Sequence, residues 1–184
     1  MSVVYISFNA PVNDFTMQNL IALSFDQIKQ GATHLYYLMS TPGGTVREGI
    51  AAYHVIKALP VKTTMHNVGG VDSIGNALFL AGDRRKSCPH STFKFHGVGF
   101  DITGIGRLEE AGVREKLASI LSDQGKMGGI ISDETSLNDS QIRNLFRKAA
   151  TKDSAYALSN GLIHAVEDVI IPAGAAMLQL VFQR

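Results

Sequence analysis

The feature that most constrains the fold is an arrangement that occurs twice: a strand-like segment, a pair of glycines and a helix-like segment. The first copy leads from the apolar segment 34–39 through Thr41-Pro42-Gly43-Gly44 into helical spacing over 45–59. The second leads from the segment 61–68, through a turn at Gly69-Gly70, into a short apolar helix over 73–80. Strands that alternate with helices predict an α/β fold.

The remaining segments agree with this class, and the 184 residues predict one domain that spans 1–184. A strand is expected over 3–8, followed by a helix that Asn13 or Asp14 caps. Alternating charges predict a long, partly solvated helix over 107–121, with an open question about its continuation past Gly125. Asn138-Asp139-Ser140 and Asp153-Ser154 predict the starts of two further helices, and strand character returns over 162–166 and 169–171.

Charge and cysteine content exclude several classes of protein. The 17 basic and 16 acidic residues give a net charge of +1, so we expect neither a nucleic-acid nor a membrane partner. Cys88 is the only cysteine, and the first residues do not resemble a signal peptide, so we expect a cytoplasmic protein. The apolar segment 169–182 is too short to span a bilayer, and it predicts a core strand, an edge strand or a subunit contact.

Ser73 is a candidate nucleophile because it would open the helix that follows Gly69-Gly70. Free amide groups at a helix N-terminus can stabilise a developing oxyanion, and Ile74 could contribute its own amide. The alternative is that Ser73 is only a helix N-cap, a common role for serine. The G-x-S-x-G motif of α/β-hydrolases is excluded, because Val71 stands at the position of its first glycine.

His96 ends a predicted strand, Thr92-Phe93-Lys94-Phe95-His96, and is a candidate general base. It could equally be a partly buried histidine with a structural hydrogen bond. The glycines of 41–44 could likewise form a tight turn without any chemical role.

Three motifs in order resemble the proteolytic subunit of the Clp protease, ClpP, over roughly 3–171. Its Ser-Pro-Gly-Gly resembles Thr41-Pro42-Gly43-Gly44, its Gly-x-Ala-x-Ser-Met-Gly resembles the segment 70–75, and its Ile-His-Gln-Pro strand resembles Lys94-Phe95-His96-Gly97. Gly161-Leu162-Ile163 is similar to a further family motif near the C-terminus.

The resemblance implies a ClpP/crotonase-like fold of repeated ββα units. It implies Ser73 as nucleophile, His96 as general base, and the amides of Gly44 and Ile74 as an oxyanion hole. The stretch that binds an extended peptide would contain Gly97, Gly99 and Phe100. It also implies a homo-oligomeric ring in which the helix after residue 106 packs two rings together, and chemistry that needs neither a metal nor a cofactor.

The sequence departs from the family in three places. The acid of the family's triad lies twelve residues before the Gly-Leu-Ile motif, and 161 − 12 = 149 is Ala149. Asp153 is the nearest acid, and its position favours a helix cap over a triad role. The proline after the histidine motif is missing. The first predicted strand also begins by Val3, where the family has a flexible segment that contacts its ATPase partner, and this argues against such docking.

These observations favour a serine endopeptidase that acts on peptides or unfolded proteins through a Ser-His pair. Because of Ala149, a ring subunit with weak or no activity and a role in assembly or regulation is a second hypothesis. An acyl-CoA enzyme of the crotonase fold is a third.

Overall fold

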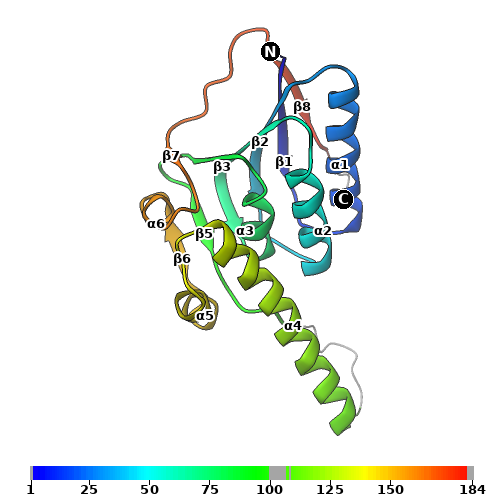
Figure 1. Ribbon diagram of the computed structural model, residues 1–184, viewed down its shortest axis with the longest axis vertical. Coiled ribbons are helices and arrows are strands. Elements are labelled where there is room, and N and C mark those ends of the chain that lie inside the picture. Colours follow the sequence, from blue (N-terminus) through cyan, green and yellow to red (C-terminus); the bar gives the residue numbers. More distant parts are fainter. Residues whose placement is uncertain (1, 100–106, 108, 182–184) are drawn as a thin grey trace.

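The computed structural model describes residues 2–99, 107 and 109–181, and its centre is an eight-stranded, mostly parallel sheet (Figure 1). The main strand order is β6-β5-β3-β2-β1-β8, while β4 pairs with β3 and β7. The strands are β1 (Val3–Asn9), β2 (His34–Thr41), β3 (Lys62–Asp72), β4 (Arg84–Ser87), β5 (Thr92–Lys94), β6 (Thr151–Asp153), β7 (Ala165–Val166) and β8 (Ala176–Gln179). The helices are α1 (Asp14–Lys29), α2 (Val46–Lys57), α3 (Ile74–Phe79), α4 (Glu110–Glu134), α5 (Asp139–Arg147) and α6 (Ser154–Ser159). The predicted α/β class is confirmed.

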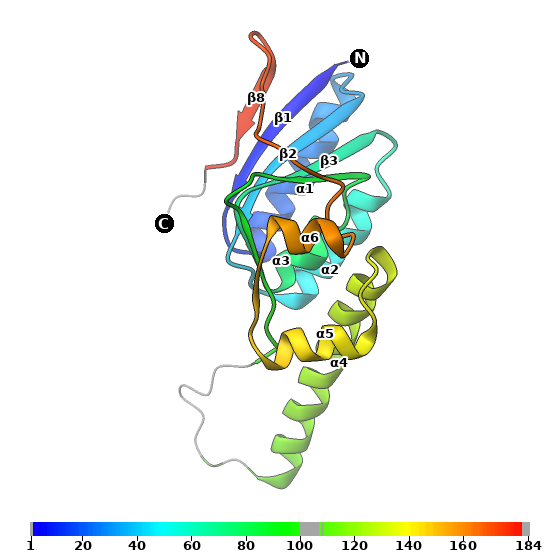
Figure 2. The same cartoon turned by 90° about the vertical axis from the view of Figure 1, so that its left-hand side faces the viewer.

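One face of the sheet packs against α1, α2 and α3 (Figures 1 and 2). Alternate residues of β2 are buried in the core on this side, because successive side chains of a strand point to opposite faces. Tyr37 belongs to this set, and its hydroxyl lies 2.9 Å from Ser24 Oγ of α1. On the opposite face the Tyr36 hydroxyl lies 2.7 Å from His66 Nδ1 of β3. The three helices therefore cover the face of the sheet to which Tyr37 points, and Tyr36 points to the opposite face.

Three helices begin at the caps that the sequence predicts. Asn13 and Thr16 form a reciprocal capping box at α1, with the Thr16 amide donating to Asn13 Oδ1 at 2.9 Å. Asn138 caps α5 in the same way. The Tyr156 amide donates to Asp153 Oδ1 at 2.8 Å, so Asp153 is the N-cap of α6. These caps depend on neighbouring residues only, which is why the sequence reveals them.

The glycine pair Gly69-Gly70 does not form a turn, so this prediction is wrong. Strand β3 continues through both glycines to Asp72 and changes partner on the way. Its residues 64–67 pair with β4, whereas residues 70–72 pair with β5. The pairing with β5 keeps the backbone extended, and it brings the end of β3 beside the strand that leads to His96.

Helix α4 is continuous for 25 residues, although it contains glycines at 112, 125, 128 and 129. Its first half projects away from the sheet in Figures 1 and 2. Farther along the helix, a β-carbon on Gly128 would lie 3.6 Å from Ile142 and 3.7 Å from Phe146, both in α5. The sequence left open whether this helix continues past Gly125. The structure shows that it does, and that Gly128 lies where α4 packs against α5.

An ion-pair network fixes the C-terminal end of α4. Glu134 binds Lys57 Nζ at 2.6 Å and Arg85 Nη1 at 3.2 Å, and it accepts a hydrogen bond from the Tyr53 hydroxyl at 2.7 Å. Burial by itself would raise the pKa of Glu134, but these partners outweigh it and lower the pKa. The network ties α4 to α2 and β4.

The C-terminal strand is β8, which pairs in parallel with β1 at the edge of the sheet. The expected strand over 169–171 is wrong, because this segment has no strand structure. Met177 and Val181 are mostly exposed, so the described part of 169–182 fits the edge-strand alternative rather than a core strand. In the described part of the chain, no helix is long and apolar enough to cross a membrane.

Candidate active site

Ser73 occupies a strained turn between β3 and α3. Its φ of 58° and ψ of −128° lie outside the regions that non-glycine residues favour. Such a conformation costs on the order of 1–3 kcal/mol and is concentrated at functional sites. Ser73 is at the N-cap position, but its side chain makes no capping hydrogen bond. The interpretation of Ser73 as an ordinary cap therefore lacks its defining contact.

Two contacts hold this turn against β5. The Ser73 amide donates to the Lys94 carbonyl at 2.8 Å. The buried side chain of Asn76 donates from Nδ2 to the Lys94 carbonyl at 2.8 Å and to the Ser73 carbonyl at 3.0 Å. Sequence reasoning did not identify Asn76. The available signal was a polar residue within a short, otherwise apolar helix.

The Gly43–Gly44 turn packs directly on Ser73. A β-carbon on Gly43 would lie 2.6 Å from Ser73 Cβ, and one on Gly44 would overlap the Val12 carbonyl oxygen. Both glycines also have positive φ, 82° and 151°, which favours glycine. The Val12 amide donates to Gly43 at 2.8 Å and the Thr45 amide donates to Val12 at 2.8 Å, so the turn is fixed on both sides.

The backbone amides of Gly44 and Ile74 are the predicted oxyanion donors near Ser73. Within the described residues, neither the Gly44 amide nor the Ile74 amide donates a hydrogen bond. Ile74 is the first residue of α3, where amides have no partner inside the helix. An oxyanion formed next to Ser73 could use such donors.

His96 and Ser73 line the same cavity, which has a volume of about 320 Å³ and also contains Gly44. The His96 Nδ1 atom lies 2.8 Å from the Gly97 carbonyl oxygen. A carbonyl can only accept, so Nδ1 carries the proton and Nε2 has the free lone pair. Among the described residues, no hydrogen bond joins Ser73 Oγ to His96. The cavity brings the two residues together without pairing them.

Ala149 lies two residues before β6, the strand that pairs with β5. Strands β5 and β6 are antiparallel with Lys94 opposite Thr151, and the Phe95 amide donates to the Ala150 carbonyl at 2.8 Å. The recorded pairing ends at Lys94 and Thr151, and the same register extended by two residues would place Ala149 opposite His96. Ala149 has a φ of 46°, so it does not itself continue the strand.

Two acids on the strands that pair with β5 differ in their surroundings. Asp153 pairs with Thr92 in the sheet, and its carboxylate caps α6. Asp72 pairs with Lys94, and burial raises its pKa although the charges of Lys94 and His96 oppose the shift. Sequence reasoning did not consider Asp72, which directly precedes Ser73.

The predicted peptide-binding stretch lies next to α4. A β-carbon on Gly97 would lie 2.9 Å from Gln124 Oε1, while Gly99 has open space around it and lines the cavity. Phe100 lies outside the described residues. In residues 2–99, 107 and 109–181, no group of three or more His, Cys, Asp or Glu side chains could share a metal ion.

The chain is similar to known proteins along most of its length. A family model described as Clp protease matches residues 2–169. The ATP-dependent Clp protease proteolytic subunit 1 of Chlamydia pneumoniae is 26% identical over 175 residues, covering 88% of this chain and 87% of the relative. The proteolytic subunit 2 of the same organism is 28% identical over 156 residues, covering 84% and 73%.

Proposed function

Because this chain belongs to the Clp protease family, we propose that it is a serine peptidase that cleaves peptides or unfolded proteins by acyl transfer through Ser73. One observation carries the proposal: Ser73, in a strained turn, shares a cavity with His96 and Gly44. The Gly43–Gly44 turn packs against the serine, as an oxyanion site requires. The proposed chemistry needs no metal and no cofactor.

In the proposed reaction the Ser73 hydroxyl attacks the scissile carbonyl carbon while His96 Nε2 takes the hydroxyl proton. The negative charge that develops on the carbonyl oxygen is stabilised by the amides of Gly44 and Ile74. His96 then protonates the leaving amine, and an acyl-enzyme ester remains on Ser73. Water, activated by the same imidazole, hydrolyses the ester. Ser73 Oγ and His96 Nε2 do not form a hydrogen bond in this structure, so a side-chain rotation must first bring them together. Long contacts between catalytic groups are common in structures without substrate.

We propose that the substrate binds in extended form beside residues 97–100, where main-chain groups can pair with it. The open space at Gly99, on the same cavity as Ser73, supports this placement. An extended substrate is the conformation that an unfolded protein supplies most readily.

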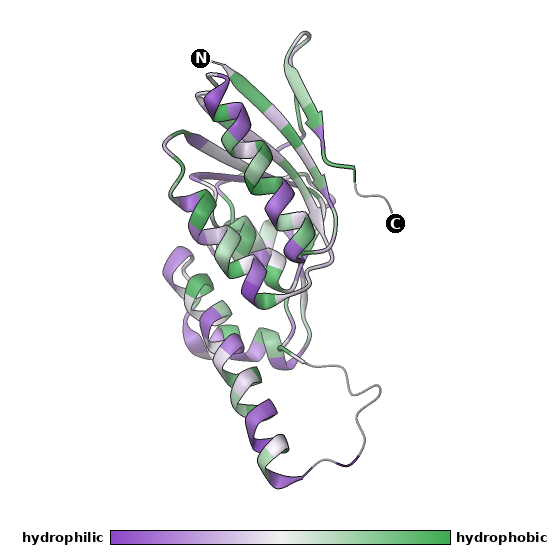
Figure 3. Ribbon diagram, turned by 90° about the vertical axis from the view of Figure 1, so that its right-hand side faces the viewer, coloured by the Kyte–Doolittle hydropathy of each residue, from purple (hydrophilic) through white to green (hydrophobic). Residues whose placement is uncertain are grey.

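The proposed assembly is a ring of identical chains in which α4 contacts other copies. Val113, Leu117 and Leu121 recur every four residues on the projecting part of α4, and each is about half exposed. Figure 3 shows hydrophobic and hydrophilic segments alternating along this part of the helix. An apolar row on a helix that extends away from the sheet is suited to helix packing between subunits.

Ala149 supports a second candidate function. Without an acid opposite His96, a catalytic pair would lack the group that stabilises the imidazolium ion. The chain would then serve mainly as a subunit that shapes or regulates a ring. The hydrogen bond from His96 Nδ1 to the Gly97 carbonyl favours residual activity, because it fixes the tautomer that catalysis needs.

Labelling with a fluorophosphonate probe distinguishes the two candidates. We expect the wild-type chain to be labelled, Ser73→Ala to be unlabelled, and His96→Gln to react at least about 100-fold more slowly. Ser140→Ala, which changes an exposed serine in α5, is the matched control and should react like the wild type. Undiminished labelling of Ser73→Ala would exclude Ser73 as the nucleophile. An intact oligomer by light scattering, with no labelling of the wild type, would favour the regulatory subunit.

A further inference from the structure

The cavity that contains Ser73 and His96 also contains a carboxylate from a distant part of the chain. Asp123 lies in α4, and it is the one acidic residue among the described residues that line this cavity. Its side chain is 31% exposed, so part of it is shielded from water. Electrostatic interactions are stronger in such a place than on an open surface.

Two basic residues, Lys126 and Arg47, lie near Asp123, and neither forms a buried ion pair with its carboxylate. Lys126 Nζ is 3.0 Å from Asp123 Oδ1, but the lysine side chain is 57% exposed. Exposed ion pairs contribute little, so a substrate cation can displace Lys126 at small cost. Arg47 also lines the cavity, yet its side chain is 87% exposed and its guanidinium binds Glu48 at 2.9 Å. Arg47 thus pairs with Glu48, and within the described residues no ion pair joins Arg47 to Asp123.

The other walls of the cavity suit the stem of a long basic side chain. Val46 and Val98 line the same space and pack partly against the core. Lysine and arginine have apolar stems that bind such surfaces while their charged ends reach a polar partner. A volume of about 320 Å³ is at the lower end of the range for ligand pockets.

Resting on the peptidase function proposed above, we propose that Asp123 makes this site selective for substrates with lysine or arginine at the residue that supplies the attacked carbonyl. The carboxylate binds the ammonium or guanidinium group, and the two valines contact the stem. The side chain of that substrate residue must lie next to Ser73, because its carbonyl carbon bonds to Ser73 Oγ. Asp123 is therefore a specificity residue and takes no part in proton transfer.

A role for Asp123 in orienting His96 is the competing explanation. His96 Nδ1 donates to the Gly97 carbonyl at 2.8 Å, and within the described residues no hydrogen bond or ion pair joins Asp123 to His96. An orienting acid would affect all substrates equally, whereas a specificity residue affects basic ones. This difference determines the design of the test.

The kinetic experiment compares fluorogenic peptides that differ only in arginine, leucine or glutamate at the cleaved residue. We expect Asp123→Asn to lower kcat/KM for the arginine peptide about 10- to 100-fold and to leave the leucine peptide within about twofold. Lys126→Gln, which removes the competing cation, should raise the preference for arginine. Asp133→Asn changes the same residue type at an exposed position of the same helix, and it should alter neither peptide. Equal losses for arginine and leucine peptides would overturn the proposal.

A binding experiment separates failure of this inference from failure of the peptidase function. In the Ser73→Ala background, fluorescence polarisation measures the affinity of labelled peptides that end in arginine or in leucine. We expect the arginine peptide to bind at least about 10-fold more tightly, and Asp123→Asn to remove the difference. Equal affinities before that substitution would refute the role of Asp123 whether or not the wild type cleaves peptides. Absence of cleavage together with selective binding would refute only the peptidase function.

Discussion

Replacement of Ala149 by aspartate tests whether the residue opposite His96 limits catalysis. Ala149 follows α5 with φ at 46°, and its amide donates to the Phe146 carbonyl at 3.2 Å. The next amide, that of Ala150, donates to the Leu145 carbonyl at 3.2 Å. The two bonds form the helix-ending motif in which glycine or asparagine usually occupies the left-handed position. Asp and Asn tolerate this conformation better than alanine, so neither substitution should unfold the chain.

The expected gain follows from the charge that His96 acquires during acylation. A carboxylate about 4 Å from an imidazolium ion interacts with it by roughly 4 kcal/mol at an effective dielectric constant near 20. Since 1.36 kcal/mol is a factor of ten in rate, the upper limit is about 10³-fold. The Gly97 carbonyl that now binds His96 Nδ1 is uncharged and supplies only part of this stabilisation. We expect Ala149→Asp to accelerate acylation by about 10²- to 10³-fold.

The assay is the rate of labelling by a fluorophosphonate, measured across pH. Ala149→Asn is the matched control, because it has nearly the same shape and conformational preference but no charge. Ala149→Gly adds a stability check, and it should raise the free energy of unfolding by about 1 kcal/mol by removing the strained β-carbon. Equal labelling rates for the Asp and Asn variants would refute the reasoning that places position 149 next to His96.

Three further predictions concern two contacts of the site and the ion-pair network of Glu134. Gly44→Ala should abolish peptide cleavage, because its β-carbon would overlap the Val12 carbonyl; wild-type activity in this variant would contradict the geometry of the turn. Asn76→Ala should lower the free energy of unfolding by about 1–3 kcal/mol in urea and slow acylation, because the two hydrogen bonds from its buried side chain to the Lys94 and Ser73 carbonyls are lost; an unchanged acylation rate would remove its positioning role. Glu134 has a lowered pKa in the folded state, so its stabilisation is complete above its unfolded pKa of about 4.3 and is lost as pH falls through the lower folded value. Glu134→Gln should therefore show a smaller loss of stability than the wild type in thermal unfolding between about pH 5 and 3; identical pH profiles would exclude the network as a source of this stability.

Features that depend on neighbouring residues were predictable from sequence. The caps at Asn13, Asn138 and Asp153 are examples, because an N-cap needs only a short side chain and an amide two or three residues away. Alternation of apolar strands with helices likewise predicted the α/β class. These signals are local, so tertiary contacts did not overturn them.

Features that depend on pairing between distant segments were not predictable in this way. Gly69 and Gly70 have the composition of a turn, but pairing of Gly70 with Thr92 of β5 keeps them in an extended strand. The last described strand lies at 176–179 because those residues pair with β1, whereas the β-branched segment 169–171 has no strand partner among the described residues. The intrinsic preference of a residue for a turn or a strand is weak compared with the hydrogen bonds and burial that a neighbouring strand supplies.

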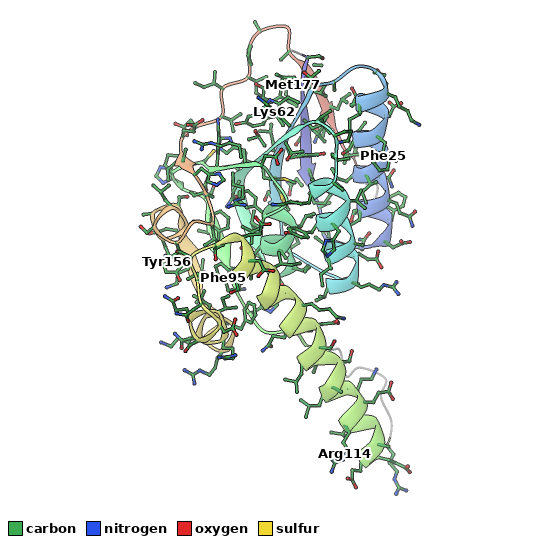
Figure 4. All side chains as sticks on the ribbon, in the orientation of Figure 1. Phe25, Lys62, Phe95, Arg114, Tyr156 and Met177 are labelled. Atoms are coloured by element: carbon green, nitrogen blue, oxygen red, sulfur yellow. The ribbon has the colours of Figure 1, made fainter. Side chains whose placement is uncertain are left out.

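The sequence by itself determined the class of fold, the order of the motifs and the candidate roles of Ser73 and His96. Only the tertiary structure decided that Ser73 occupies a strained turn without capping its helix, and that Ala149 just precedes the strand that pairs with β5. It alone brought Asp123 to the cavity, fifty residues from Ser73 in the chain (123 − 73 = 50). Figure 4 shows how far α4 extends, with Arg114 near its projecting end and Phe95 within the body of the protein. The physical reason is that a site depends on distances between side chains from separate elements, and strand register and helix packing set those distances.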